Sequence, residues 1–425
     1  MESLRTKIGR RKVVLAALGL MAALLCVISF VRNLPALLRP APIDLAAYYA
    51  AARLLNEGRA DELYDLEAQR AAVAGEGVGS VAGGYIYPPF LAVVMRPLAS
   101  LPFRVAALVW LALNLALLAA SARSLLPIAR LSPSAAHVLL VFAFCLLLPP
   151  VTATLALGQI NILLLFLLVN AALLAGSASA LPARERLAGL LIGAAAGMKL
   201  FPLVVLVPLT LRRRWAVVLW GLVGIVLTVA VGIAGGGGLA NTSRYLQEIV
   251  PSIPSPSLPT NQSIAGAVQR LLQSSVERFS VLSVDNEVSV VACALVELPS
   301  LVRPMTLGLS AGVLLVTLWV LLKSPVGMVG SDISLALSTA LLVLPLAWEH
   351  YHVLLLLPWA TWLGSAQNRR QAFAVILLSV LALGVHRFWK PLAVAGVPVW
   401  ALSFGLLAVL VTWLYTVRLL RSGAA

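Results

Sequence analysis

Long apolar runs alternate along this chain with short clusters of basic residues. Each run indicates a helix in lipid, because a helix satisfies its own backbone hydrogen bonds where water is absent. Several of the runs are shorter than the roughly 20 residues that a full crossing requires. The apolar segments lie at residues 13–31, 88–102, 104–122, 135–152, 155–175, 187–198, 200–211, 214–234, 304–322, 333–347, 352–365, 371–385 and 398–418. The pattern predicts an all-α, multi-pass membrane protein.

The composition supports this class and removes others. Hydrophobic residues make up 61% of the chain and charged residues 11%, whereas soluble proteins have roughly 45–50% and about 25%. The formal charge of +15 arises from 31 Lys and Arg against 16 Asp and Glu. In a membrane protein such an excess belongs in cytoplasmic loops, so it does not indicate a nucleic-acid partner. The sequence contains no zinc motif, dinucleotide-binding fingerprint or nucleophile elbow.

The positions of the basic clusters predict the topology. They lie at residues 123–130, 184–186, 212–214, 323, 369–370 and 418–421. All of them face the cytoplasm if segment 88–102, interrupted by Arg96 and Pro97, enters the outer leaflet and returns. This choice gives about twelve spans in a single domain, 1–425, with both termini inside. We expect segment 13–31 to remain as an uncleaved first helix, because it is too long for an ordinary signal core.

This topology brings the remaining polar segments to the outer face. They are a first loop at 32–87, a second loop at 235–303, and two tips at 348–352 and 386–391. Segments 187–198 and 200–211 form a predicted re-entrant hairpin with Lys199 at its apex. Acids, aromatic residues and cations thus meet at the depth of lipid headgroups. We expect an outward-facing site for an amphipathic ligand that bears a phosphate.

Asp44 is the main candidate for chemistry in the first loop. Residues 45–56 read as a short helix with Tyr48 on its apolar side, so Asp44 can simply be the N-cap of that helix. A cap and a catalytic base are compatible, because capping leaves one carboxylate oxygen unused. Partly apolar surroundings would raise the proton affinity of Asp44 toward the range useful for accepting a proton from a sugar hydroxyl.

Aromatic and amide side chains are candidates for substrate contacts. Tyr87, which precedes two prolines, fits an interfacial aromatic belt and also a wall that stacks on a sugar ring. Gln159 and Asn161 can bond neighbouring helices or a ligand. Asn261 and Gln262 in the second loop are treated as possible substrate contacts.

Three cationic or titratable residues are candidates for binding phosphate. Lys199 would cost about 2.5–3.5 kcal/mol in an apolar hairpin unless it is paired or hydrated. Snorkelling to the interface is one explanation, and a counter-charge for phosphate is the other. His350 is a candidate hydrogen-bond donor to phosphate or orienting partner for the base, and Arg270 is a further candidate phosphate contact. Glu349, His350 and His352 could bind a metal, but a His-x-His pair on a turn is weak evidence when no third ligand is identified. We therefore predict no metal cofactor and leave a divalent ion open.

Taken in order, these residues resemble a known family. The pieces are Asp44 with 48–53, 87–89, Leu101-Pro102 through Trp110 and Asn114, 158–161, Ala188-Gly189 through Lys199 and Pro202, 261–263, and 348–351. Together they are similar to the bacterial polyprenol-phosphate-mannose-dependent mannosyltransferases of the GT-C superfamily, related to the enzyme that extends phosphatidylinositol mannosides in mycobacteria. The resemblance implies a GT-C bundle in the bacterial inner membrane, with outward loops and short re-entrant or juxtamembrane helices.

The resemblance also implies an activity. Such enzymes transfer a hexose, most often mannose, from a polyprenyl-phosphate donor to a lipid-linked or cell-envelope glycan, with inversion. Asp44 matches the catalytic aspartate of the first extracytoplasmic loop. Lys199, His350 and Arg270 would stabilise the charge that grows on the leaving phosphate. Typical members have a longer second loop and less acidic neighbours of the histidine than Glu349.

Two readings from other classes are compatible with a polytopic chain. A transporter or lipid flippase usually shows internal repeats and midplane polar groups, whereas this sequence shows no clear repeat and its acids lie outside. A structural membrane subunit would not require a lysine at a hairpin apex opposite an acid-bearing loop. The sequence therefore favours a glycosyltransferase.

Overall fold

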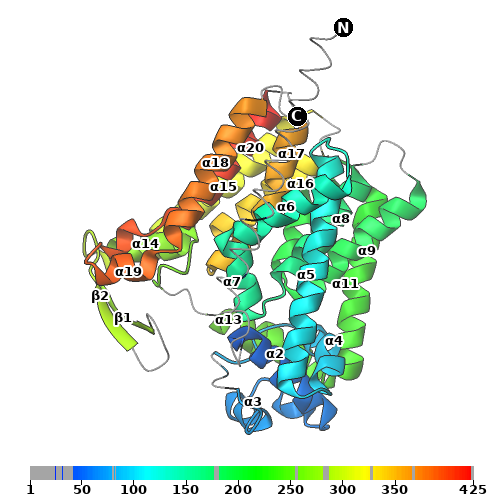
Figure 1. Cartoon of the computed structure of the whole chain (residues 1–425), viewed down its shortest axis with the longest axis vertical. Helices are drawn as coiled ribbons and strands as arrows, with labels where there is room; N and C mark the ends of the chain where they lie inside the picture. The colour runs from blue at the N-terminus through cyan, green and yellow to red at the C-terminus, as the bar shows by residue number, and fades with distance from the viewer. Residues whose placement is uncertain are drawn as a thin grey trace.

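The structure is a computed structural model that describes residues 24, 31, 42–78, 81, 83–176, 181–253, 257–280, 287–325, 329–365 and 369–422. These residues form a helical bundle with one two-stranded sheet. The first predicted span, 13–31, lies outside the described residues apart from Leu24 and Val31. The C-terminus lies at one end of the molecule, and α2, α3 and α4 lie at the other (Figure 1).

The first predicted outer loop folds into a small helical layer. It contains α2 (Ile43–Asn56), the 3-10 turn η1 (Ala60–Glu62) and α3 (Leu66–Ala72), and α4 (Pro89–Ala99) follows. Residues 45–52 of α2 are all buried. α4 has 11 residues, or about 16 Å, which is too short to cross a bilayer. Its length agrees with the predicted return of segment 88–102, while its position relative to lipid stays a prediction.

Long apolar helices form the frame of the bundle. Five are long and apolar enough to cross a membrane, and a sixth span is possible if α6 and α7, bent by 76°, count as one. The five are α5 (Phe103–Ile128), α11 (Trp215–Gly235), α15 (Pro299–Lys323), α18 (Arg369–His386) and α20 (Phe404–Arg421), the last of which is counted together with the 3-10 turn η5 (Val399–Ala401). The described residues thus do not confirm about twelve spans.

The count falls short because many apolar segments are short or broken helices. Pro149 and Pro150 begin a new helix at the bend, because proline removes backbone donors. Irregular backbone of this kind persists at membrane depth only where protein or a wet cavity covers it. The short or broken segments are α6 (Ala135–Leu147), α7 (Pro149–Leu157), α8 (Asn161–Ala175), η2 (Phe201–Val205), α10 (Leu206–Leu211), α16 (Val329–Val343), η4 (Glu349–Leu355) and α17 (Leu356–Ser365).

Helix α9 (Pro182–Met198) packs unusually close to α11. A Cβ added at Gly189 would lie 2.4 Å from the Val217 carbonyl oxygen, and one at Gly193 would lie 2.6 Å from the Gly221 carbonyl oxygen. Small residues four apart allow such backbone approach in membrane helices. This packing fixes the C-terminal end of α9, where Lys199 follows directly.

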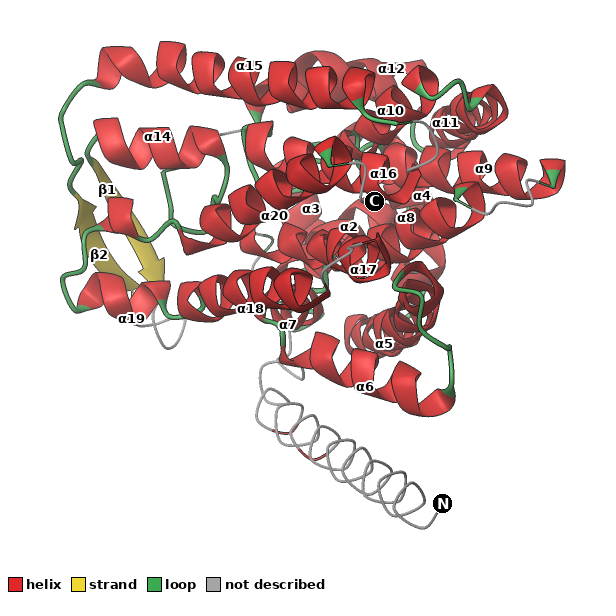
Figure 2. Ribbon diagram, turned by 90° about the horizontal axis from the view of Figure 1, so that it is seen from above, coloured by secondary structure: helices red, strands yellow, loops and turns green. Residues whose placement is uncertain are grey.

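The second predicted loop contains the strands, which an all-α prediction missed. It holds α12 (Gly238–Arg244), the π-helical turn η3 (Tyr245–Ile249), α13 (Val250–Ser252), α14 (Ile264–Leu272), β1 (Ser275–Ser280) and β2 (Glu287–Ala292). The strands pair antiparallel, with Ser275 opposite Ala292. In β2, Val288 and Val290 alternate with polar residues, but β1 has no such alternation, and both strands are too short to register as an apolar run. From above, this sheet lies beside α14 and α19 (Trp389–Val394), away from α9 and α11 (Figure 2).

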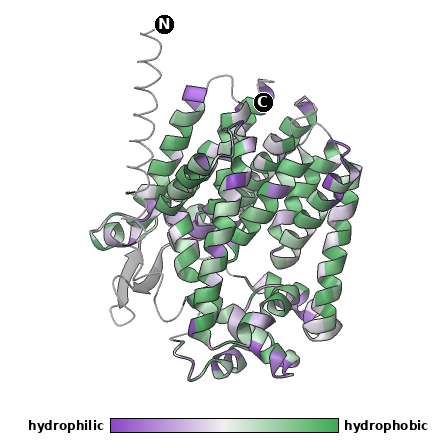
Figure 3. Ribbon diagram, turned by 45° about the vertical axis from the view of Figure 1, so that its right-hand side comes forward, coloured by the Kyte–Doolittle hydropathy of each residue, from purple (hydrophilic) through white to green (hydrophobic). Residues whose placement is uncertain are grey.

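The outer surface of the bundle is apolar. Leu315, Leu318 and Leu322 on α15 are 67%, 41% and 61% exposed. Figure 3 shows hydrophobic residues along the sides of the long helices and hydrophilic residues gathered toward their ends and loops. Apolar surface on this scale marks contact with lipid.

Candidate active site

Asp44 lies in the first turn of α2 and accepts a hydrogen bond from an amide. Gln159 Nε2 donates to Asp44 Oδ2 over 2.8 Å. The helix begins at Ile43 with Pro42 at the cap position, so the prediction that Asp44 caps a helix starting at residue 45 was wrong by two residues. Its carboxylate still lies near the positive end of the helix dipole. The bond to Gln159 occupies one carboxylate oxygen.

Gly158 brings Gln159 to Asp44. It ends α7 with a left-handed backbone, φ 69°, which glycine adopts without steric cost. A Cβ at this position would lie 2.6 Å from Leu45 Cβ on α2. Trp110 Nε1 donates to the Gly158 carbonyl oxygen over 2.8 Å. The α7–α8 turn is therefore held against the first turn of α2 and sets the position of Gln159.

We expect Gly158→Ala to lower both activity and melting temperature. The alanine would require a left-handed backbone, at about 1–2 kcal/mol, and would also collide with Leu45. Gly58→Ala is the matched control, since Gly58 has φ 75° and no atom within 4 Å of the added Cβ. Transfer assays should show a loss of about tenfold for Gly158→Ala only. The melting temperature should fall further for Gly158→Ala than for Gly58→Ala, which carries the backbone cost without the collision. Equal effects of the two substitutions would show that the contact with Leu45 has no importance.

Two tyrosines fix the orientation of the Gln159 amide. Tyr48 Oη donates to Gln159 Oε1 over 2.7 Å, and Tyr87 Oη lies 3.3 Å from Nε2 and 3.4 Å from Oε1. The Tyr48 and Tyr87 rings meet edge to face with centroids 5.0 Å apart. Tyr85 instead donates to the Pro88 carbonyl and accepts from the Ala92 amide. Tyr48 and Tyr87 therefore belong to the site, and Tyr85 stabilises the start of α4.

Lys199 follows the end of α9, at the break before η2. Only 7% of it is exposed, and its Nζ donates to Asn161 Oδ1 over 3.1 Å. The ammonium lies 3.8 Å from the centroid of the Tyr351 ring and 5.4 Å from that of Tyr87. These contacts partly replace the water that the cation loses on burial. The Lys199 side chain thus points into the protein, toward Asn161, Tyr87 and Tyr351. This direction does not agree with snorkelling to the interface.

His350 lies beside this cation on the turn η4. Its carbonyl oxygen accepts from Asn161 Nδ2 and Thr154 Oγ1, each at 3.2 Å. The ring is buried between Trp348 and Tyr351, and its Nε2 has no hydrogen-bond partner among the described residues. Burial lowers the pKa of His350. A neutral ring with one unpartnered nitrogen can bind a ligand that reaches this position.

The structure does not bring Arg270, Asn261 and Gln262 into this group. Arg270 is buried and donates to the carbonyl oxygens of Ser257, Leu258 and Asn261 and to Ser403 Oγ. The Asn261 side chain bonds the backbone of 345–347, and that of Gln262 bonds the backbone of 402–406 and Pro259. These contacts hold the second loop against Trp348, which forms a bridge with Asn261. Asn261 thus contacts the backbone that leads into η4, whereas Arg270 and the Gln262 side chain contact the backbone of 257–261 and the segment at 402–406.

Several residues at the site lay outside the predicted set. Tyr351 supplies the closest aromatic face to Lys199, and Thr154 helps to hold η4. Tyr351 belongs to the motif at 348–351, so its position next to His350 was the sequence signal that could have identified it. Thr154 and Trp110 become informative only when α7 is known to pack beside η4 and α5.

The described residues contain no group of three or more side chains suited to hold a metal ion. His386 Nε2 lies 3.5 Å from Glu349 Oε2, which joins the two predicted outer tips. His352 is buried, and neither of its ring nitrogens has a hydrogen-bond partner in the described part of the chain. The His386–Glu349 pair stabilises packing and offers too few ligands for tetrahedral coordination of a metal ion.

Burial changes the acidity of the candidate base. Removal of the carboxylate from water raises the pKa of Asp44 to about 6, while the Gln159 hydrogen bond and the Lys199 charge lower it and offset part of this rise. A pKa in this range lets the group be ionised at pH 7 and still accept a proton readily.

An apolar pocket opens beside the same residues. It has a volume of about 80 Å³ and lies between α4, α9, α11 and the α12–η3 segment. Its wall includes Pro88, next to Tyr87, and Leu200, next to Lys199. A ligand whose charged group contacts Lys199 could therefore place a hydrocarbon chain against this wall.

The chain is similar in sequence to named bacterial mannosyltransferases. It is 29% identical over 327 residues, 75% of this chain, to a polyprenol-phosphate-mannose-dependent alpha-(1-2)-phosphatidylinositol pentamannoside mannosyltransferase of Mycobacterium tuberculosis. A similarly named enzyme of Mycolicibacterium smegmatis is 30% identical over 325 residues, also 75% of this chain. The aligned regions cover 65% and 68% of these relatives, so the chain spans about two thirds of their length.

The family match covers the middle of the chain. The sequence profile of glycosyltransferase family 87 matches residues 85–345, a segment that includes Tyr87, Gln159, Asn161 and Lys199 but neither Asp44 nor His350. The match covers more than half of the chain, and the similar relatives agree with it. The chain therefore belongs to glycosyltransferase family 87.

Proposed function

We propose that this protein transfers mannose from a polyprenyl-phosphate donor to a lipid-linked or cell-envelope glycan, with inversion at the anomeric carbon. The observation that carries the proposal is the group formed by Asp44, Gln159, Asn161, Lys199 and His350. Gln159 donates to Asp44, Lys199 donates to Asn161, and Asn161 donates to the backbone carbonyl of His350. Tyr87 contacts both Gln159 and Lys199, which supports treating the carboxylate, the buried cation and the histidine as one site. These are the groups that a single displacement at a glycosyl phosphate requires.

The proposed reaction is a single displacement. Asp44 accepts the proton of an acceptor hydroxyl through the oxygen that Gln159 does not occupy. The acceptor oxygen then forms a bond with the anomeric carbon, while the bond from that carbon to the phosphate oxygen breaks. Polyprenyl phosphate leaves as an anion, so the leaving group needs no general acid. Lys199 stabilises the charge that grows on it, and the unpartnered Nε2 of His350 would contact a phosphate oxygen.

Two observations support a lipid-linked donor. The apolar pocket is lined by Leu200 and Pro88, which directly follow Lys199 and Tyr87 in the sequence, and we propose that a chain bound there has its phosphate near the cation. The relatives are named as enzymes that use polyprenol-phosphate-mannose and act on phosphatidylinositol mannosides. We propose the same class of donor here, and a glycolipid or glycan acceptor.

We further propose that the site faces the outside of the inner membrane. α2 lies at the end of the molecule opposite the C-terminus (Figure 1), and the last turn of α20 carries Arg418 and Arg421. The positive-inside bias assigns that basic end to the cytoplasm. A reporter fused after Arg421 should be active in the cytosol, and one inserted at Gly58 should be active outside. A cytosolic signal at Gly58 would contradict this orientation.

The reaction is tested with the purified protein in lipid vesicles. Radiolabelled polyprenyl-phosphate-mannose is supplied with a phosphatidylinositol mannoside acceptor, and the equivalent nucleotide sugar is supplied in a parallel reaction. We expect label transfer only from the lipid-linked donor. NMR of the product should show that its anomeric configuration is inverted relative to the donor. Transfer from the nucleotide sugar alone would overturn the donor, and retention of configuration would overturn the single displacement.

The raised pKa of Asp44 predicts how activity depends on pH. The base must be ionised, so kcat/KM should fall about tenfold per unit below pH 6 and reach a plateau above it. The Gln159 hydrogen bond favours the ionised form. Gln159→Leu should therefore move the acid limb to higher pH. An unchanged pH profile in this variant would contradict the assignment of the limb to Asp44.

A further inference from the structure

A second pocket lies at the opposite end of the molecule from Asp44. Its volume is about 560 Å³, and its wall comes from the ends of α5, α8 and α17 and the starts of α9 and α16. α8 begins at Asn161 in the active site, and its last residues form part of this pocket. At 1.5 Å per residue, its 15 residues separate the two sites by about 20 Å. The pocket therefore does not belong to the site already described.

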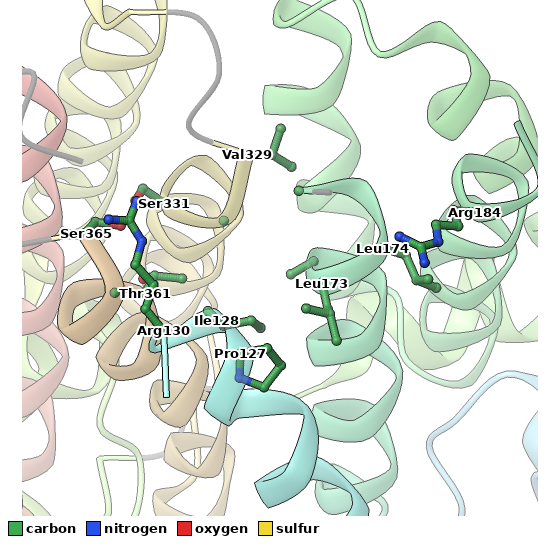
Figure 4. A pocket seen from close by; sticks show the side chains of 14 residues that line it. Pro127, Ile128, Arg130, Leu173, Leu174, Arg184, Val329, Ser331, Thr361 and Ser365 are labelled. Carbon is green, nitrogen blue, oxygen red and sulfur yellow. The ribbon is translucent and has the colours of Figure 1, made fainter. Parts of the chain in front are cut away.

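The lining combines cations with hydroxyl and apolar groups. Arg130 and Arg184 line it, and none of the lining residues that the structure describes is acidic. In Figure 4 the Arg130 side chain extends past Thr361 toward Ser331 and Ser365, and Arg184 lies beyond Leu173 and Leu174. Asp332 follows Ser331, yet its carboxylate is paired with Arg212 at 2.6 and 2.8 Å. The local charge in the pocket is therefore positive.

The rest of the wall suits the region of a phospholipid that joins the headgroup to the acyl chains more than it suits a hydrated ion. Pro127, Ile128, Leu173 and Leu174 give the pocket an apolar side. The pocket lies where α5 ends, and α5, with 26 residues or about 39 Å, is long enough to cross the hydrocarbon core. The end of such a helix lies at headgroup depth. A phosphodiester at this level would contact arginine, which binds phosphate through paired N–H groups.

The backbone conformation of Arg130 identifies a matched control residue elsewhere in the chain. Arg130 has φ 55°, at a helix end where glycine is the usual residue. A side chain in this conformation carries a steric cost. Arg213 has the same conformation, φ 56°, but does not line the pocket. The strain alone therefore carries no argument, but Arg213 provides a control matched in charge and backbone.

We propose that this pocket binds the headgroup of an anionic phospholipid in the leaflet at the basic end, with its phosphate at Arg130 and the charge of Arg184 on the opposite wall. Ser331 and Thr361, which are 4% and 3% exposed, are buried hydroxyl residues of the wall. This binding is separate from the transfer reaction and does not depend on it. Juxtamembrane cations each contribute roughly 1 kcal/mol to binding of anionic lipid.

Native mass spectrometry of the purified full chain tests the proposal. The protein is incubated in detergent with phosphatidylglycerol or with phosphatidylcholine, and retained lipid is counted. We expect retention of phosphatidylglycerol, lowered about tenfold or more in Arg130→Asn/Arg184→Gln, the loss expected for two cations. Asparagine is chosen at 130 because it tolerates the left-handed backbone. Retention at the wild-type level in this variant would overturn the proposal.

The control variant is Arg213→Asn/Arg370→Gln, which removes two exposed arginines from outside the pocket. It should keep lipid retention within about twofold of the wild type, and an equal loss would show that surface charge alone is responsible. Inorganic phosphate is tested in parallel for thermal stabilisation. If it stabilises the protein as much as phosphatidylglycerol does, the pocket binds a free anion, and the proposal of a lipid ligand is wrong. If the double variant does not fold, Arg184→Gln alone decides, with an expected loss of about fivefold.

Discussion

Asp44→Asn should abolish sugar transfer while leaving the protein folded. Asparagine keeps the size of the side chain and an oxygen that can accept from Gln159 Nε2, so the contact between α2 and the α7–α8 turn is retained. It cannot accept the proton of the acceptor hydroxyl. General-base catalysis contributes about 10²- to 10⁴-fold, and we expect kcat to fall by roughly 10³-fold. The measurement is initial-rate transfer from polyprenyl-phosphate-mannose.

The control for this variant is Asp61→Asn. Asp61 is an exposed acid in the same loop, on η1, and its loss changes the net charge equally. It should keep wild-type kcat. Asp44→Asn should bind the donor with an unchanged Kd and melt at the wild-type temperature or above, because it removes a carboxylate whose ionised form is disfavoured by burial. Wild-type turnover in Asp44→Asn would remove Asp44 as the base.

Lys199→Met should have the second largest effect. Methionine fills the same volume and removes the charge, and the aromatic faces of Tyr87 and Tyr351 remain suited to its thioether. The donor phosphate gains charge as the glycosyl bond breaks, so the loss should fall more on kcat than on the donor KM. Loss of one preorganised electrostatic contact costs about 10²- to 10³-fold in kcat.

Product inhibition separates this role of Lys199 from a structural one. Polyprenyl phosphate should inhibit Lys199→Met more weakly than the wild type, while the KM for the acceptor should not change. Asn161→Leu provides the comparison, since it removes the hydrogen bond to Lys199 but leaves the cation in place. It should lower kcat less than Lys199→Met does. Equal inhibition of wild type and Lys199→Met by polyprenyl phosphate would contradict contact between Lys199 and the leaving group.

The local sequence predicted those site residues that are polar or charged within apolar surroundings, because burying such side chains costs free energy. Lys199 is a cation in an apolar hairpin, Asp44 is an acid directly after a membrane-length run, and Gln159 is an amide between two apolar segments. Each is expensive to bury without a partner. The structure joins Asp44 to Gln159, and Lys199 to Asn161. Residues chosen for the cost of their burial were thus brought together by the fold.

Features set by distant contacts could not be predicted in this way. Arg270 reads as a phosphate contact from its charge, yet the fold surrounds it with carbonyl oxygens of 257–261. The bend between α6 and α7 and the brevity of α16 depend on burial inside the bundle. Hydropathy records whether a segment is apolar, but not whether lipid or protein surrounds it. The predicted number of spans therefore exceeded the helices long enough to cross.

The single orientation of the Gln159 amide restricts what can reach the base. With Nε2 donating to Asp44 and Oε1 accepting from Tyr48, one flank of the carboxylate is closed. An incoming sugar must present its hydroxyl from the remaining flank, so the pose of the acceptor ring decides which alcohol is glycosylated. Regioselectivity in this enzyme would then be a matter of approach direction, and enlarging or shrinking residue 48 is the change that should redirect it.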